Sequence, residues 1–81
     1  MSTTLYRYRE LHPFGAPVIG AGYTSAAEAK DCASTHADYL MRRAETELPG
    51  AVETSAVIVE RYWTDPRWYR EPETVASFPI R

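Results

Sequence analysis

The sequence predicts an α+β fold in which one long helix, about residues 25–47, packs on a small, mostly antiparallel sheet. Three observations lead to this prediction. Apolar and polar residues alternate near the N-terminus, a capped helix with an apolar stripe occupies the middle, and strand-like segments follow it. A chain of 81 residues suits one domain, so we treat residues 1–81 as a single unit.

The first expected strand covers residues 3–11, where successive side chains alternate between two faces. Its two tyrosines share one face, which we expect to point into the core, and its two arginines share the other. Residues 12–22 are rich in proline and glycine. We therefore predict a loop there, with at most a short strand at Val18 and Ile19.

The helix has clear local signals at both ends. Ser25, with Glu28 three residues later, forms a capping box that starts it. Pro49 is expected to stop it, because proline disfavours helical geometry at the residue before it. At about 100° per residue, one apolar stripe faces the expected sheet. Its members are Ala26, Ala29, Ala33, Ala37, Leu40, Ala44 and Leu48.

The remaining strands follow the helix. Residues 52–63 are expected to form the central strand, and residues 67–71 would return beside it. Residues 74–80 would add an edge strand, because Pro79 lacks the N–H group that an interior strand must donate.

The most distinctive segment is residues 60–71, ERYWTDPRWYRE, which reads almost the same in both directions. Its midpoint, Asp65-Pro66, is a turn-forming pair, so we predict a hairpin folded there. Tryptophan, tyrosine and arginine are the side chains that contribute most often to protein interfaces. We therefore expect this hairpin to bind a partner through Arg61, Tyr62, Trp63, Arg67, Trp68, Tyr69 and Arg70.

The register of this hairpin stays open. A symmetric fold sets Trp63 opposite Trp68, but it also sets like charges opposite each other, which is unfavourable. A shift by one residue sets Arg61 opposite Glu71 and removes that repulsion. The tryptophans are equally suited to the core of so small a domain, whereas arginine rarely buries without a partner.

Few residues suggest catalysis or cofactor binding. Cys32 and His36 lie on adjacent turns of the expected helix, as a nucleophile and its base require, but Cys32 lies beyond the favourable field of the helix N-terminus. A metal site built on Cys32 and His36 would need two further ligands, and His12 alone cannot complete it. Residues 18–27 resemble a dinucleotide-binding glycine loop, but Ser25 replaces the third glycine. We expect no catalytic residue, metal or cofactor.

Composition limits the partners and the compartment. A net charge of −2 argues against a nucleic-acid binder driven by bulk charge, since phosphate contacts supply most of that affinity. With one cysteine and no apolar run near the roughly 20 residues of a membrane span, we expect a cytoplasmic protein without a membrane segment. Small size and a sheet edge without a guarding lysine favour a homodimer.

The leading functional hypothesis is a small non-enzymatic protein-binding module, an adaptor or inhibitor, that uses the 60–71 hairpin. One alternative is an enzyme that depends on the Cys/His pair. Another is a nucleic-acid binder in which bases stack on the hairpin aromatics and on a first-strand surface. That surface would consist of Tyr6, Arg7, Tyr8 and Arg9. The identity of the protein partner does not follow from the sequence.

Overall fold

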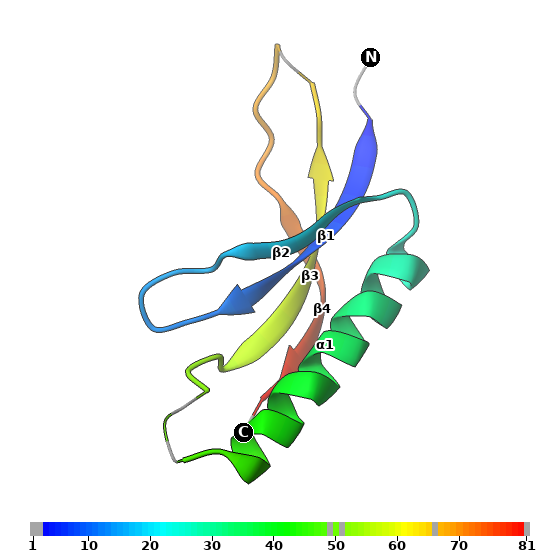
Figure 1. The fold of residues 1–81 in the computed structure, drawn as a ribbon. Helices are drawn as coiled ribbons and strands as arrows, with labels where there is room; N and C mark the ends of the chain where they lie inside the picture. Colours follow the sequence, from blue (N-terminus) through cyan, green and yellow to red (C-terminus); the bar gives the residue numbers. More distant parts are fainter. Residues whose placement is uncertain (1–2, 49, 51, 66, 81) are drawn as a thin grey trace.

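The computed structural model describes residues 3–48, 50, 52–65 and 67–80 of the chain. One helix packs against a four-stranded antiparallel sheet, which confirms the predicted α+β fold (Figure 1). In chain order the elements are β1 (Thr4–Leu11), β2 (Val18–Tyr23), α1 (Ala26–Thr46), β3 (Ala56–Trp63) and β4 (Glu73–Pro79).

The strands lie side by side in the order β2-β1-β3-β4, and each neighbouring pair is antiparallel. β1 and β3 form the centre of the sheet, in a continuous register from Thr4 opposite Trp63 to Leu11 opposite Ala56. β4 is an edge strand, as the position of Pro79 predicts. The first strand, in contrast, lies in the interior of the sheet.

The glycine-rich segment after β1 forms a strand, so the loop predicted for residues 12–22 is too long. Glycine is required here because the ring of Tyr8 lies over β2. A Cβ atom at Gly20 would lie 2.4 Å from Cε1 of Tyr8, which is closer than two carbon atoms can approach. Residues 18–27 are therefore an antiparallel strand leading into a helix, rather than a glycine loop.

The helix begins and ends within a residue or two of its predicted limits. The Ser25 side chain accepts a hydrogen bond from the backbone N–H of Glu28 at 3.4 Å, as the capping box requires. Pro49, the predicted stop, lies outside the described residues. Leu48 is 83% exposed, so its assignment to the apolar stripe is wrong. The chain is already extended at Glu47, which places Leu48 beyond the helical periodicity.

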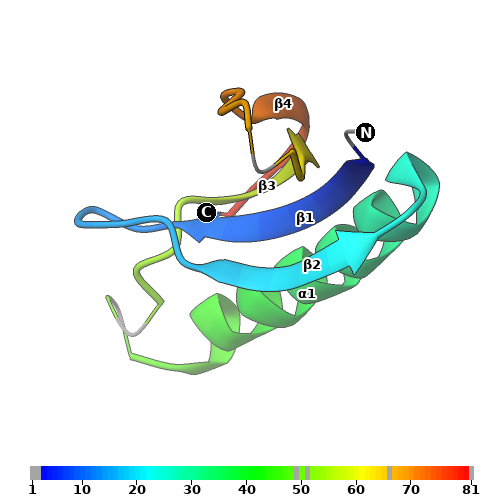
Figure 2. The same ribbon diagram turned by 90° about the horizontal axis from the view of Figure 1, so that it is seen from above.

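The core lies between α1 and one face of the sheet (Figure 2). The alanines of the helix let its backbone approach the strands closely, and the tyrosines of β1 pack against the same cluster, as predicted. The buried members are Ala29, Ala33, Ala37, Leu40, Val57, Val59 and Ile80.

Residues 64–72, which we call the arm, connect β3 to β4 and extend past the first turn of α1 (Figure 1). The described residues of the arm belong to no helix or strand. The molecule measures 48 × 25 × 14 Å, and its radius of gyration is 13.8 Å. A compact domain of this length has a radius of gyration of about 12 Å. The arm is thus a projection from the packed body.

Candidate functional site

The arm does not form the predicted hairpin. β3 pairs with β4, so Arg61 lies opposite Glu73 and Glu60 lies opposite Thr74. The return strand expected at residues 67–71 is wrong, and neither of the two registers considered for it occurs.

Core packing explains this difference. Val75 and Phe78 of β4 pack against the buried cluster. Burying such side chains contributes about 1.5–3 kcal/mol each when burial is complete. An aromatic pair across two strands contributes only about 0.2–1 kcal/mol. β4 therefore pairs with β3 in the place where residues 67–71 were expected. The predicted turn at Asp65-Pro66 cannot be compared in full, because Pro66 lies outside the described residues.

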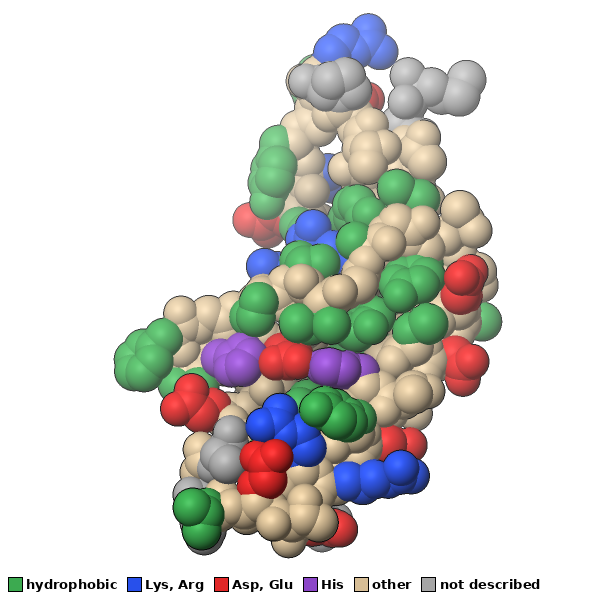
Figure 3. Space-filling model, viewed as in Figure 1, with side chains coloured by type: hydrophobic (Ala, Val, Ile, Leu, Met, Phe, Trp, Pro, Cys, Tyr) green, Lys and Arg blue, Asp and Glu red, His purple; other side chains and the backbone are tan. Residues whose placement is uncertain are grey.

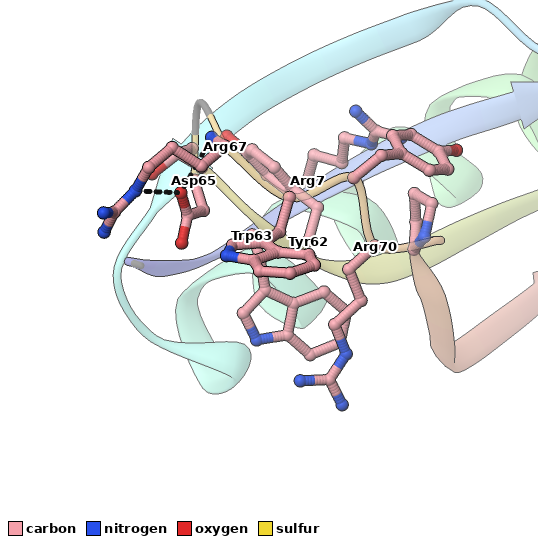
Figure 4. Close-up of a pocket in the computed structure, with 10 residues that line it drawn as sticks. Arg7, Tyr62, Trp63, Asp65, Arg67 and Arg70 are labelled. Atoms are coloured by element: carbon pink, nitrogen blue, oxygen red, sulfur yellow. Dashed lines mark hydrogen bonds and ion pairs between the residues drawn. The ribbon is translucent and has the colours of Figure 1, made fainter. Parts of the chain in front are cut away.

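A hollow of about 580 Å³ lies between the arm and the neighbouring parts of β1 and β3 (Figure 4). Arg7 contributes from β1, and the rest of the wall comes from the end of β3 and from the arm. Six of the seven predicted binding residues line it: Tyr62, Trp63, Arg67, Trp68, Tyr69 and Arg70.

The aromatic side chains of the arm are open to solvent. Trp68 is 74% exposed and Tyr69 is 86% exposed, whereas Trp63 is half-buried. Arg67 and Arg70 are also exposed. Arg61 is partly buried, so of the three arginines of this segment only Arg67 and Arg70 are exposed, and the exposed side chains of the arm are not core material.

Two arginines hold the half-buried rings of the hollow. The guanidinium carbon of Arg70 lies 3.8 Å from the ring centre of Trp63. The guanidinium of Arg7 lies 4.8 Å from the ring centre of Tyr62. Such cation–π contacts contribute about 0.5–1 kcal/mol at exposed sites. They favour the observed orientation of two of the four aromatic side chains before any partner binds.

Carboxylates bind the arginines around the hollow. Glu60 accepts from Arg7 at 3.0 Å and from Arg9 at 3.3 Å, and it is only 7% exposed. Its burial on the uncovered face of the sheet is explained by these two cations. Glu73 is shared in the same way between Arg61 at 3.4 Å and Arg70 at 3.5 Å.

Arg61 is the predicted binding residue that the structure does not bring to the hollow. It lies opposite Tyr6 on the neighbouring strand, with its guanidinium carbon 5.8 Å from that ring centre. Its guanidinium supports the hollow indirectly, because it binds the same carboxylate, Glu73, as Arg70. Arg7, which the sequence assigned only to the nucleic-acid alternative, also lines the hollow. Only the β1–β3 register, which sets Arg7 opposite Glu60, brings it there.

Cys32 and His36 line a separate hollow of about 380 Å³ beside Tyr8 and Tyr39. No hydrogen bond joins these two described residues. The neighbouring Cys32 and the burial of the ring raise the pKa of the Tyr23 hydroxyl to about 12.

The imidazole of His36 instead binds the carboxylate of Glu10. His12 binds the other oxygen of Glu10 at 2.8 Å, and the hydroxyl of Thr54 donates to that oxygen at 3.1 Å. Figure 3 shows the two histidines on one surface with an acidic side chain between them. Burial alone would raise the pKa of Glu10, but these hydrogen bonds outweigh it and hold the pKa below 4.5. The cluster joins β1, α1 and the segment before β3.

The residues of the nucleic-acid alternative do not share one surface. Tyr6 and Tyr8 pack toward α1, whereas Arg7 and Arg9 bind Glu60 on the other face of the sheet. Among the residues that the structure describes, no group of three His, Cys, Asp or Glu side chains is placed to hold a metal ion.

Within the described ranges, no helix combines the length and apolar character needed to cross a membrane. Comparison of the chain with protein-family models, with curated proteins and with solved structures finds no significant match.

Proposed function

We propose that this protein is a small, non-enzymatic protein-binding module that contacts its partner through the hollow beside the arm. The observation that carries the proposal is the exposure of Trp68 and Tyr69 at a concave surface. Large aromatic side chains gathered in a polar-rimmed surface are typical of interaction sites, because covering them with a partner is favourable.

The contacts within the hollow support the same proposal. Trp63 and Tyr62 are held by Arg70 and Arg7, and those arginines are held by carboxylates. A surface that is ordered before binding loses less conformational entropy when the partner arrives. From the single cysteine we infer that the protein works in the cytoplasm, and from the edge position of β4 that it forms a homodimer.

An affinity pull-down from the cells that make the protein tests the proposed function. Three baits are compared: the wild-type chain, a Trp68→Ala/Tyr69→Ala variant and a Phe14→Ala control. Phe14 is fully exposed in the β1–β2 connection, at the opposite end of β1 from the arm. We expect a partner that the wild type and the control retain and the double variant loses. Equal retention by all three baits contradicts a binding role for the arm.

A further inference from the structure

Two hollows adjoin each other at the arm. The larger one, of about 580 Å³, and a smaller one, of about 230 Å³, share Trp63, Asp65, Trp68 and Arg70 in their walls. The two indole side chains therefore stand at the boundary between two depressions. A ligand that occupies both hollows contacts the two tryptophans.

The charge of this surface is opposite in sign to that of the whole chain. The larger hollow is lined by three arginines and by Asp65, which gives a formal charge of +2, whereas the chain carries −2. Glu60 and Glu73 are not part of the lining, and each binds one arginine of the hollow and a second arginine outside it, so including all four groups leaves the excess of +2 unchanged. Charge complementarity favours an acidic partner.

Building on the proposed function, we propose that the arm binds an acidic, proline-containing segment of a partner protein in the polyproline II conformation. Proline-rich segments adopt this extended form before binding, and they dock into aromatic-lined grooves at a low entropic cost. The two adjoining hollows accept successive parts of such a segment. Acidic side chains along it are attracted by the net positive charge of this surface, because its arginines outnumber the carboxylates that pair with them.

The ion pairs of the hollow favour a peptide over a nucleic acid. Each of its three arginines already has a carboxylate oxygen nearby, at 3.0, 3.9 and 3.5 Å. A nucleic acid derives most of its affinity from the neutralisation of phosphates by cations and the release of counterions. Cations that already have carboxylate partners supply less of that effect. A proline-containing peptide derives its affinity from contact with the aromatic rings, and the arginines select the sign of its charge.

Fluorescence anisotropy with labelled peptides of equal length tests this proposal. The first peptide repeats Pro-Pro-Glu, the second has lysine in place of each glutamate, and the third has glycine in place of each proline. We expect the first to bind, and the other two to bind at least about tenfold more weakly. Equal binding of the lysine peptide refutes the acidic preference. Equal binding of the glycine peptide refutes recognition of the polyproline II form.

Variants of the arm connect this binding to the hollow. We expect Trp68→Ala to weaken the Pro-Pro-Glu peptide by roughly 30-fold, which is typical of a central interface aromatic. Phe14→Ala is the matched control and should leave binding unchanged. Arg67→Glu should weaken the acidic peptide and strengthen the lysine peptide. All three side chains are exposed, so an unchanged melting temperature for each variant shows that its fold is intact.

The outcomes separate this inference from the function on which it rests. If no peptide binds but the pull-down yields a partner that the Trp68→Ala/Tyr69→Ala variant loses, the peptide class is wrong and the protein-binding function stands. If both experiments fail, the proposed function fails as well. If a single-stranded thymidine oligonucleotide binds in place of the peptides and requires Trp68, the partner is a nucleic acid and both proposals are refuted.

Discussion

Leu40 tests the packing of α1 on the sheet more directly than any other helix residue. It is 4% exposed and belongs to the same buried cluster as Val57 and Val59 of the central strand. Replacing it by aspartate removes the apolar contact and places a carboxylate among apolar side chains, where water no longer solvates it.

The magnitude follows from the size of the chain. A domain of 81 residues has a free energy of unfolding of about 4–12 kcal/mol. Truncation of a buried leucine to alanine costs about 2–5 kcal/mol. We therefore expect Leu40→Ala to lower the melting temperature by at least about 8 °C. Leu40→Asp adds the desolvation of a charge to this loss and should leave the chain unfolded at room temperature.

Circular dichroism during heating measures both effects. Leu48→Asp is the matched control, because it makes the same substitution at a leucine that is 83% exposed. Its effect should stay within about 0.5 kcal/mol. If Leu40→Asp melts at the temperature of the wild type, α1 does not pack through this face and the assignment of the core is wrong.

Three further predictions concern β2, the acidic cluster and the sheet edge. Gly20→Ala should destabilise the protein by about 1–3 kcal/mol in urea unfolding, because the ring of Tyr8 must move, whereas Gly15→Ala, with no atom near its added carbon, should not. The pKa of Glu10 lies below its ordinary value of 4.5, so its ionised form stabilises the fold above that pH and this contribution is lost as the pH falls below it. Urea unfolding across this range should show a weaker acid dependence for Glu10→Gln, and an identical dependence would show that another group is responsible. Analytical ultracentrifugation at micromolar concentration should detect a dimer paired through β4, and a single 9.2 kDa species would falsify that expectation.

The helix could be predicted closely because its determinants are local. The capping pair and the alanine spacing lie within one segment, and the stripe from Ala29 to Leu40 is buried as expected. At Leu48 the same spacing predicts a buried side chain that is in fact exposed, because the helix ends before this residue. β2 was predicted only in part, as a short strand at Val18 and Ile19, for a different reason. Its two glycines are typical of a loop, and the contact that requires glycine at position 20, the ring of Tyr8, comes from another strand.

The candidate site was predictable in composition but not in shape. The aromatic residues and arginines of the arm could be identified because they are adjacent in sequence. The return strand could not be placed, because the competition between residues 67–71 and β4 is decided by contacts with a distant core. Arg7 could not be assigned to the protein-binding site from the sequence, because its partner in the sheet, Glu60, lies 53 residues away along the chain.

The pairing of β1 with β3 also sets the order in which the protein can assemble. β1 is made first, but the strand that completes the centre of the sheet follows only after the whole of α1. While the chain is being synthesised, β1, β2 and the helix exist without Val57 and Val59, so no closed core can form around them. Contacts over such separations slow folding. A chain that ends before β3 can pair the tyrosines of β1 only with β2 and α1, so part of its apolar surface stays uncovered, and such incomplete cores favour aggregation during folding.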